Sequence, residues 1–99
     1  MSQSFSAVLM NERDNVATVL VDLEAKIIVT ASYGDRKIDV KLLHSIPFGH
    51  KFAVDSIKKG EKIYKYGEII GVASCDIEIG EHVHVHNLEG TRGRGDISG

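Results

Sequence analysis

The hydrophobic and polar positions of this chain follow the pattern of short β-strands joined by turns. Residues 5–10 form a short apolar stretch, and the polar run at residues 11–15 predicts a turn after it. Residues 16–21 are ambiguous by periodicity, but their β-branched side chains favour a strand. We expect little helix, because no segment carries a sustained apolar stripe at helical spacing with capping residues.

Three further strands are predicted along the rest of the chain. Residues 27–31 and 37–40 are strand-like, and Tyr33-Gly34-Asp35 between them is a plausible hairpin turn. Residues 70–75 form an apolar strand that ends in the single cysteine, Cys75. We expect Cys75 to be a small core residue and not a nucleophile.

A degenerate repeat is the most informative feature of this layout. In each copy an apolar run leads through a small polar loop into another apolar stretch, and the copies span residues 22–27, 56–61 and 76–81. We therefore expect turns at 24–26, 58–61 and 78–81. Gly60 and Gly80 stand where a positive φ is needed, which glycine adopts without a side-chain clash. Because Lys26 occupies that place in the first copy, its turn should differ.

The repeat has a simpler interpretation, since any all-β protein alternates strands and turns. In either case, many short strands joined by tight turns predict a mostly-β fold, compact and barrel-like or clip-like. We expect one domain over residues 1–90, followed by a flexible, glycine- and arginine-rich tail at 91–99.

The histidines form the main chemical signal. Residues 80–87 alternate strictly, so on a strand His82, His84 and His86 would share one face while Val83 and Val85 face the core. Neighbouring imidazoles on that face, ~7 Å apart, can converge on one ion, but His82 and His86 would be about twice as far apart.

We therefore predict a metal site formed by His84, His86 and His50. The alternative is a solvated strand face that happens to be rich in histidine. His44 follows two leucines and is expected to be structural.

Composition and charge exclude several classes of function. A net charge of −2 gives no electrostatic reason to expect nucleic acid or an anionic membrane as a partner. No apolar run approaches the ~20 residues of a membrane helix, and the first six residues lack the features of a signal peptide. The single cysteine suits a reducing compartment, so we expect a cytoplasmic protein. At 99 residues the chain is too small to enclose a deep active site without a partner.

Three motifs together resemble a known family. They are Ile46-Pro47-Phe48-Gly49-His50-Lys51, Lys65-Tyr66-Gly67-Glu68-Ile69-Ile70-Gly71 and Gly80-Glu81-His82-Val83-His84-Val85-His86-Asn87. They resemble the amino-terminal domain of altronate and galactarate dehydratases, a member of the SAF domain group, in the family's order and spacing. The Arg92-Gly93-Arg94-Gly95-Asp96 segment looks like the end of stand-alone small subunits of that family, so the resemblance covers nearly the whole chain.

The resemblance implies a SAF-like β-clip fold and a metal-assisted lyase reaction on a sugar acid, with iron(II) as the expected metal. A much larger catalytic portion, absent here, follows this domain in the family, so a large dehydratase subunit is the implied partner. His50, His84 and His86 are then the candidate catalytic residues. Lys51 and Lys65 could hold the substrate carboxylate.

Asn87, Arg92 and Arg94 are further candidates for binding the substrate. The two arginines could instead contact an acidic surface of the partner or simply keep the tail soluble. In isolation the chain could form a homo-oligomer.

Three other functions stay open at this point. Sulfolactate sulfo-lyase has a similar small subunit and releases sulfite in place of water. A SAF-type domain can also be a non-catalytic module that binds carbohydrate or has a structural role. A free-standing cupin-like metal enzyme is suggested by His82, His84 and Glu89, but the glycine and proline signals of a cupin do not fall in the expected order.

Overall fold

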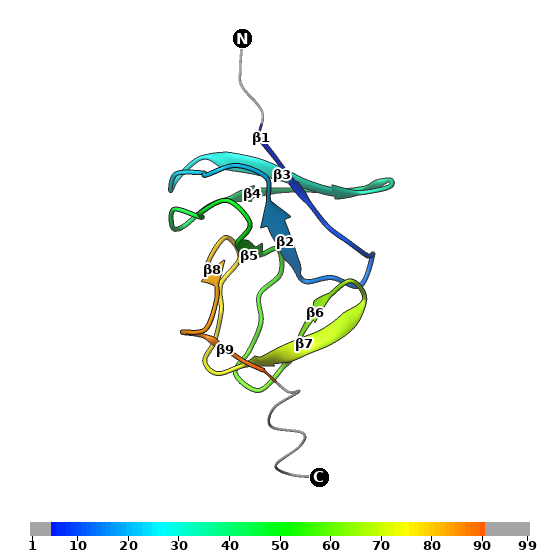
Figure 1. The fold of residues 1–99 in the computed structure, drawn as a ribbon, viewed down its shortest axis with the longest axis vertical. Helices are drawn as coiled ribbons and strands as arrows, with labels where there is room; N and C mark the ends of the chain where they lie inside the picture. Colours follow the sequence, from blue (N-terminus) through cyan, green and yellow to red (C-terminus); the bar gives the residue numbers. More distant parts are fainter. Residues whose placement is uncertain (1–4, 91–99) are drawn as a thin grey trace.

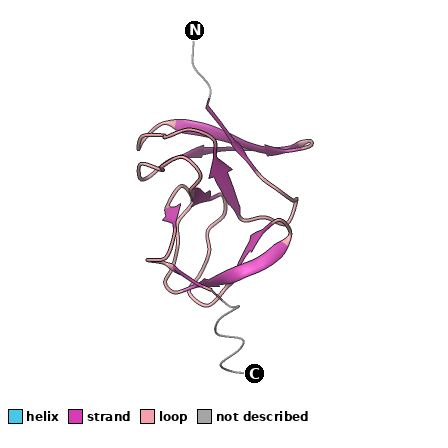
Figure 2. Ribbon diagram, in the orientation of Figure 1, coloured by secondary structure: helices cyan, strands magenta, loops and turns pink. Residues whose placement is uncertain are grey.

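A computed structural model of the protein describes residues 5–90, and these residues form nine short strands and no helix (Figures 1 and 2). The strands are β1 (Phe5–Val8), β2 (Val16–Val19), β3 (Ile28–Tyr33), β4 (Arg36–Lys41), β5 (Lys51–Ala53), β6 (Lys62–Lys65), β7 (Glu68–Ala73), β8 (His82–Val83) and β9 (Leu88–Glu89). The expected mostly-β fold with little helix is confirmed.

Two sheets organise the strands. The larger has the order β4-β3-β1-β2-β5-β8, in which only β1 and β3 are parallel. The smaller has the order β6-β7-β9 and lies below the larger sheet in the view of Figure 1. Because β1 and β3 are parallel, the chain must cross over between them, and it does so through β2 and a long loop.

The central strands β2 and β5 separate two hydrophobic cores. Ala17, Val19 and Phe52 pack into one core, whereas their neighbours Val16 and Ala53 pack into the other. This division follows from strand geometry, since successive side chains point to opposite faces. The second core also takes up β8 and the smaller sheet. Strand β5 therefore packs against a core on both faces, whereas β8 contributes Val83 to the second core only.

Four turns of one kind connect these strands. Each turn contains a residue with positive φ, and two backbone hydrogen bonds join the turn to one partner residue in another segment. The N–H of the positive-φ residue donates to the carbonyl of the partner. The N–H of the partner donates to the carbonyl of the residue that follows the positive-φ residue. The positive-φ residues and their partners are Lys26 with Leu42, Gly49 with Val19, Gly60 with Ala73 and Gly80 with Ala53. Two of the turns precede strands β5 and β8, which are neighbours in the sheet.

The turns pair up through their apolar residues. Leu23 and Ile46 exchange two backbone hydrogen bonds, as do Ile57 and Ile77. The pairs are also capped in the same way: Asp22 accepts a bond from the Phe48 N–H and Asp76 accepts one from the Lys59 N–H. The repeat predicted from the sequence is therefore real, and it has a fourth copy at residues 46–50.

Two expectations about this layout are wrong. Lys26 adopts φ 76°, close to the values of Gly49, Gly60 and Gly80, so the first turn does not differ from the others. A left-handed conformation costs a non-glycine residue about 1–2 kcal/mol, which the bonds to Leu42 offset. Cys75 is exposed and not in the core, because β7 ends at Ala73 and the chain turns before reaching it.

One predicted segment and the membrane expectation complete the comparison of the fold with the sequence. The expected tail at 91–99 is not among the described residues. Within residues 5–90 there is no helix of the length and apolar character needed to span a membrane.

Candidate functional site

Three imidazoles meet where β5 and β8 lie side by side. His50 directly precedes β5, His82 begins β8 and His84 follows it. In the register of these strands Phe52 is opposite His82, so the even-numbered residues His50 and His82 share one face. The turn bonds at Gly49 and Gly80 fix where both strands start. Residues 32 positions apart are thereby brought into contact.

The cluster is tight enough to bind one ion. The Nδ1 atom of His50 lies 2.9 Å from the Nε2 atom of His82, and one nitrogen from each of His50, His82 and His84 lies within 4.8 Å of the others. The ring centroid of His84 lies 4.6 Å from the ring centroid of His50 and 5.6 Å from that of His82, and the rings of His82 and His84 are nearly parallel. All three side chains are half-buried, so the group is open to ligands from outside.

Asn87 positions the third histidine. Its side chain is fully buried, and its Oδ1 atom accepts a hydrogen bond from the His84 N–H while its Nδ2 atom donates to the His82 carbonyl. The backbone N–H groups of Asn87 and Leu88 also donate to the His84 carbonyl, which closes a turn over residues 84–87. Because its amide is engaged by backbone groups, Asn87 is better placed to hold this turn than to contact a substrate.

The strand predicted from the alternation of residues 80–87 is wrong beyond Val83. The strand ends at Val83, which is buried as expected, but Val85 is 79% exposed. The strict alternation of residues 80–87 suggested an extended strand, whereas the Asn87 side chain stabilises a turn. By bending the chain, the turn brings His84 beside His82 and leaves the exposed His86 with its ring 5.5 Å from that of His82.

Two imidazoles of the cluster, those of His82 and His84, favour the neutral form. Partial burial, followed by the nearby His50, lowers the pKa of His82 from 6.5 to about 4. Partial desolvation lowers the pKa of His84, with His50 and Lys51 adding to the effect. Neutral imidazole is the form that binds metals and accepts protons. Near pH 7, therefore, His82 and His84 are ready for either role.

Two lysines act electrostatically near the site: Lys51 on β5, opposite Val83, and Lys65 at the end of β6. Burial, and then the charge of Lys65, lowers the pKa of Lys51 below its ordinary value. Lys51 in turn affects His84, so the two lysines and the histidines form one electrostatic group. No ion pair joins either lysine to a carboxylate within residues 5–90. The group is suited to receive an anion from outside the chain.

The structure brings together most, but not all, of the residues selected from the sequence. His50 and His84, which were both predicted for the site, lie together in the cluster. The third member is His82, which was not in the predicted set. His86 touches this group through His82 but contributes no nitrogen to it. Arg92 and Arg94 lie outside the described residues. His44 is exposed, and it makes the smallest contribution to the lowered pKa of His82. No ring contact between His44 and the cluster is found within residues 5–90.

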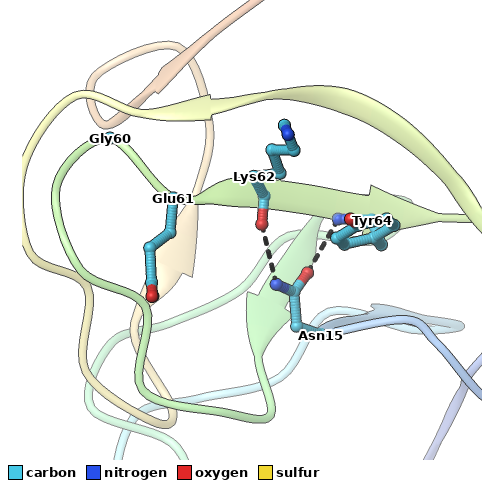
Figure 3. A pocket seen from close by; sticks show the side chains of 5 residues that line it. All are labelled: Asn15, Gly60, Glu61, Lys62 and Tyr64. Atoms are coloured by element: carbon cyan, nitrogen blue, oxygen red, sulfur yellow. Dashed lines mark hydrogen bonds between the residues drawn. The ribbon is translucent and has the colours of Figure 1, made fainter.

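A separate hollow of about 380 Å³ is lined by Asn15, Gly60, Glu61, Lys62 and Tyr64 (Figure 3). The Asn15 amide donates to the Lys62 carbonyl and accepts a bond from the Tyr64 N–H. Both polar ends of Asn15 are thus used to attach β6 to the loop before β2. We regard this hollow as structural.

Comparison with known proteins identifies relatives over most of the chain. The family model of the altronate/galactarate dehydratase SAF domain matches residues 5–91. An altronate dehydratase of Bacillus subtilis is 43% identical over 84 residues, and one of Escherichia coli is 43% identical over 74. These alignments cover 85% and 75% of this chain but only 16% and 14% of the dehydratases. The chain therefore spans about one sixth of the length of these relatives.

A second type of relative is of similar size to the matched region. The (2R)-sulfolactate sulfo-lyase subunit alpha of Paracoccus pantotrophus is 40% identical over 65 residues, which are 66% of this chain and 94% of that subunit. The matched family model covers every described strand and all three histidines of the cluster. On this evidence the chain belongs to the altronate/galactarate dehydratase SAF domain family.

Proposed function

We propose that this chain is the small subunit of a sugar-acid hydro-lyase of the altronate/galactarate dehydratase type, and that it contributes His50, His82 and His84 to a metal-assisted site completed by a large subunit. The observation that carries this proposal is the convergence of three imidazole nitrogens within 4.8 Å. The relatives named altronate dehydratase support the reaction class. The short alignment with them supports the need for a larger partner.

The donor set fits a divalent transition metal such as iron(II). Two nitrogens that bind one ion at ~2.1 Å can lie at most about 4 Å apart, and the 2.9 Å between the His50 and His82 nitrogens is within this limit. Imidazole is a suitable ligand for iron as well as zinc. With three ligands from this chain, positions remain for substrate oxygens or for a group of the large subunit.

The chain's own residues can serve the two proton transfers of a dehydration. Removal of water β to a carboxylate requires a base for the α-proton and an acid for the departing hydroxyl. A neutral imidazole that is not bound to metal can accept the first proton, and the exposed His86 beside His82 is available for this role. When bound, the metal would supply Lewis-acid stabilisation of the negative charge on the substrate carboxylate and its enediolate.

Lys51 and Lys65 orient the substrate in this account. Their ammonium groups have no carboxylate partner among the described residues, and Lys51 is close enough to affect His84. A substrate carboxylate between the lysines and the imidazoles would neutralise this group. Half-burial strengthens such a contact, because water screens it less than on an open surface.

Sulfolactate sulfo-lyase is a second candidate, favoured by one observation. The alignment covers 94% of the alpha subunit of that enzyme, so a chain of about this size is a complete subunit there. In this reaction sulfite would leave in place of water. The histidines and lysines would keep the same roles.

An assay of the chain alone and with a large subunit tests the proposal. The purified chain and the large lyase subunit of the same organism would be assayed with iron(II) on altronate, galactarate and sulfolactate, separately and mixed. We expect turnover only in the mixture, because residues 5–90 alone cannot surround a polyhydroxy acid and exclude water. Full turnover by the single chain would overturn the small-subunit role. Carbohydrate binding without turnover in any mixture would favour a non-catalytic module.

A further inference from the structure

Exposed apolar side chains lie on or next to the turns that precede β5 and β8 and on the turn of residues 84–87. Leu20, Leu43, Phe48, Ile79 and Val85 are between 45% and 79% exposed, and together they form what we call the apolar rim. Single exposed apolar residues are common on proteins, but gathered ones mark interaction surfaces. The rim residues belong to loops that cluster along one side of the molecule, at the left in Figure 1.

Backbone contacts place the rim beside the imidazoles. Phe48 is two residues before His50, and the Gly49 N–H donates to the Val19 carbonyl, which puts Leu20 next to this turn. On the other side, the Leu43 N–H donates to the Gly80 carbonyl, so Leu43 adjoins Ile79 and the start of β8.

Val85 completes the rim at the turn of the site. It stands between His84 and His86 in sequence and is the most exposed member of the rim. The histidine cluster and the apolar rim are therefore parts of one face.

Positive groups and carboxylates both lie on this face. The groups that act on His82 and His84 are other histidines and Lys51, and the group that acts on Lys51 is Lys65. Asp22 accepts a hydrogen bond from the Phe48 N–H, and the Glu81 Oε2 atom lies 3.4 Å from the Asn87 Nδ2 atom. Within residues 5–90, no carboxylate forms an ion pair with Lys51 or Lys65.

We infer that the apolar rim is the surface on which the large lyase subunit docks, so that the histidine cluster lies inside the contact between the subunits. This inference rests on the proposed function. The occupant should be a surface with apolar side chains opposite the rim and at least one acidic group directed at Lys51 and Lys65. Docking there would exclude water from the imidazoles and close the site that the small domain leaves open.

The altronate dehydratases support this choice of occupant. In those relatives about five sixths of the polypeptide lies beyond the region matched by this chain. A domain joined to such a large remainder needs a face to pack against it. In this chain the rim is the exposed apolar surface that also contains the residues of the candidate site.

Two rim variants and one matched control test the inference. Leu43→Asp and Phe48→Ala alter the rim, whereas Tyr33→Asp alters a residue at the end of β3 with the same 45% exposure as Leu43. The hairpin between β3 and β4 lies at the right in Figure 1, away from the loops of the rim. The affinity of each purified chain for the large subunit would be measured by titration calorimetry. We expect at least a tenfold loss for each rim variant and less than a twofold change for Tyr33→Asp.

The possible failures are distinguishable. If the wild type binds and activates the large subunit but the rim variants do so equally well, the inference is wrong and the proposed function stands. If the wild type does not bind the large subunit at all, both fail. If the wild type is a dimer that Phe48→Ala dissociates, the rim is a self-contact and the inference is overturned. Thermal melts establish that each variant is folded, and Ile79→Asp replaces any variant that is not.

Discussion

The Nδ1 atom of His50 lies 2.9 Å from the Nε2 atom of His82, although 32 positions separate the two residues in the chain. This contact is produced by the pairing of β5 with β8 and by the turns at Gly49 and Gly80 that precede these strands. The proposed metal site thus lies where two paired strands begin and end. Ligands anchored by paired strands are held more accurately than ligands on free loops.

Replacing a histidine of the cluster should abolish metal binding without unfolding the domain. For His82→Ala or His84→Ala we expect at least a tenfold loss of iron(II) affinity, because one of three ligands is removed. His86→Ala should have a smaller effect, and His44→Ala, an exposed control, almost none. Anaerobic titration calorimetry of the purified chain measures these affinities. Equal affinity in all four variants would show that the metal binds elsewhere.

Asn87→Ala should damage both stability and metal binding. The buried amide bonds to the His84 N–H and the His82 carbonyl, and its removal leaves both groups without a partner. We expect a loss of about 1–3 kcal/mol in the free energy of unfolding. Metal affinity should also fall, because the turn no longer holds His84 in place. Denaturant unfolding and metal titration of the same sample check the two effects. An unchanged unfolding midpoint would contradict the positioning role.

Stability of the metal-free domain should fall with pH. The pKa of His82 is about 4 in the folded protein and near 6.5 in the unfolded chain, so the unfolded chain takes up the proton first. The stability contribution is therefore complete above pH 6.5 and is lost progressively between pH 6.5 and 4. After allowance for solvent screening of this partly exposed group, the loss is of the order of 1 kcal/mol.

The variant His82→Asn separates this effect from general acid unfolding. Urea unfolding with a chelator at pH 7.5 and 4.5 should show a smaller difference between the two pH values in this variant than in the wild type. Equal differences would mean that His82 is not the group responsible.

Two glycines of the repeated turn should respond differently to alanine. Gly60 and Gly80 have nearly the same positive φ, at 89° and 90°, but they differ in their surroundings. A Cβ at Gly60 meets open space, whereas one at Gly80 would collide with the Lys41 carbonyl. We expect Gly60→Ala to cost about 1 kcal/mol and Gly80→Ala about 2–4 kcal/mol. Denaturant unfolding provides the comparison, and equal losses would indicate that backbone conformation alone decides.

The fold was predictable to the extent that local patterns determine it. Alternation and β-branched residues located β1 to β4 and β7, and glycine located the turns at Gly60 and Gly80. The short strands β5 and β9 were not predicted. The turn at Gly49 was missed as a member of the repeat, because its proline and phenylalanine obscure the pattern. Lys26 was misjudged because its φ depends on bonds to Leu42, which lies far along the chain. Such long-range bonds leave no local signal in the sequence.

The site was predictable in composition but not in geometry. The sequence indicated that His50 and His84 act together, and the cluster contains both. His82 was set aside because distances were calculated for a straight strand. The Asn87 side chain ends that strand by accepting a hydrogen bond from the His84 N–H, and asparagine is a residue type that favours turns. Greater weight on Asn87 would have predicted the turn and the exposure of Val85.

Turnover by the assembled enzyme tests the central claim most directly. The chain would be combined with the large lyase subunit and iron(II), and kcat would be measured on the substrate for the wild type, His84→Ala and the remote exposed control Tyr33→Ala. We predict that His84→Ala lowers kcat at least a hundredfold while its Tm and its affinity for the large subunit stay near those of the wild type, and that Tyr33→Ala is fully active. Wild-type kcat in the His84→Ala complex would contradict the claim that this domain's histidines take part in catalysis.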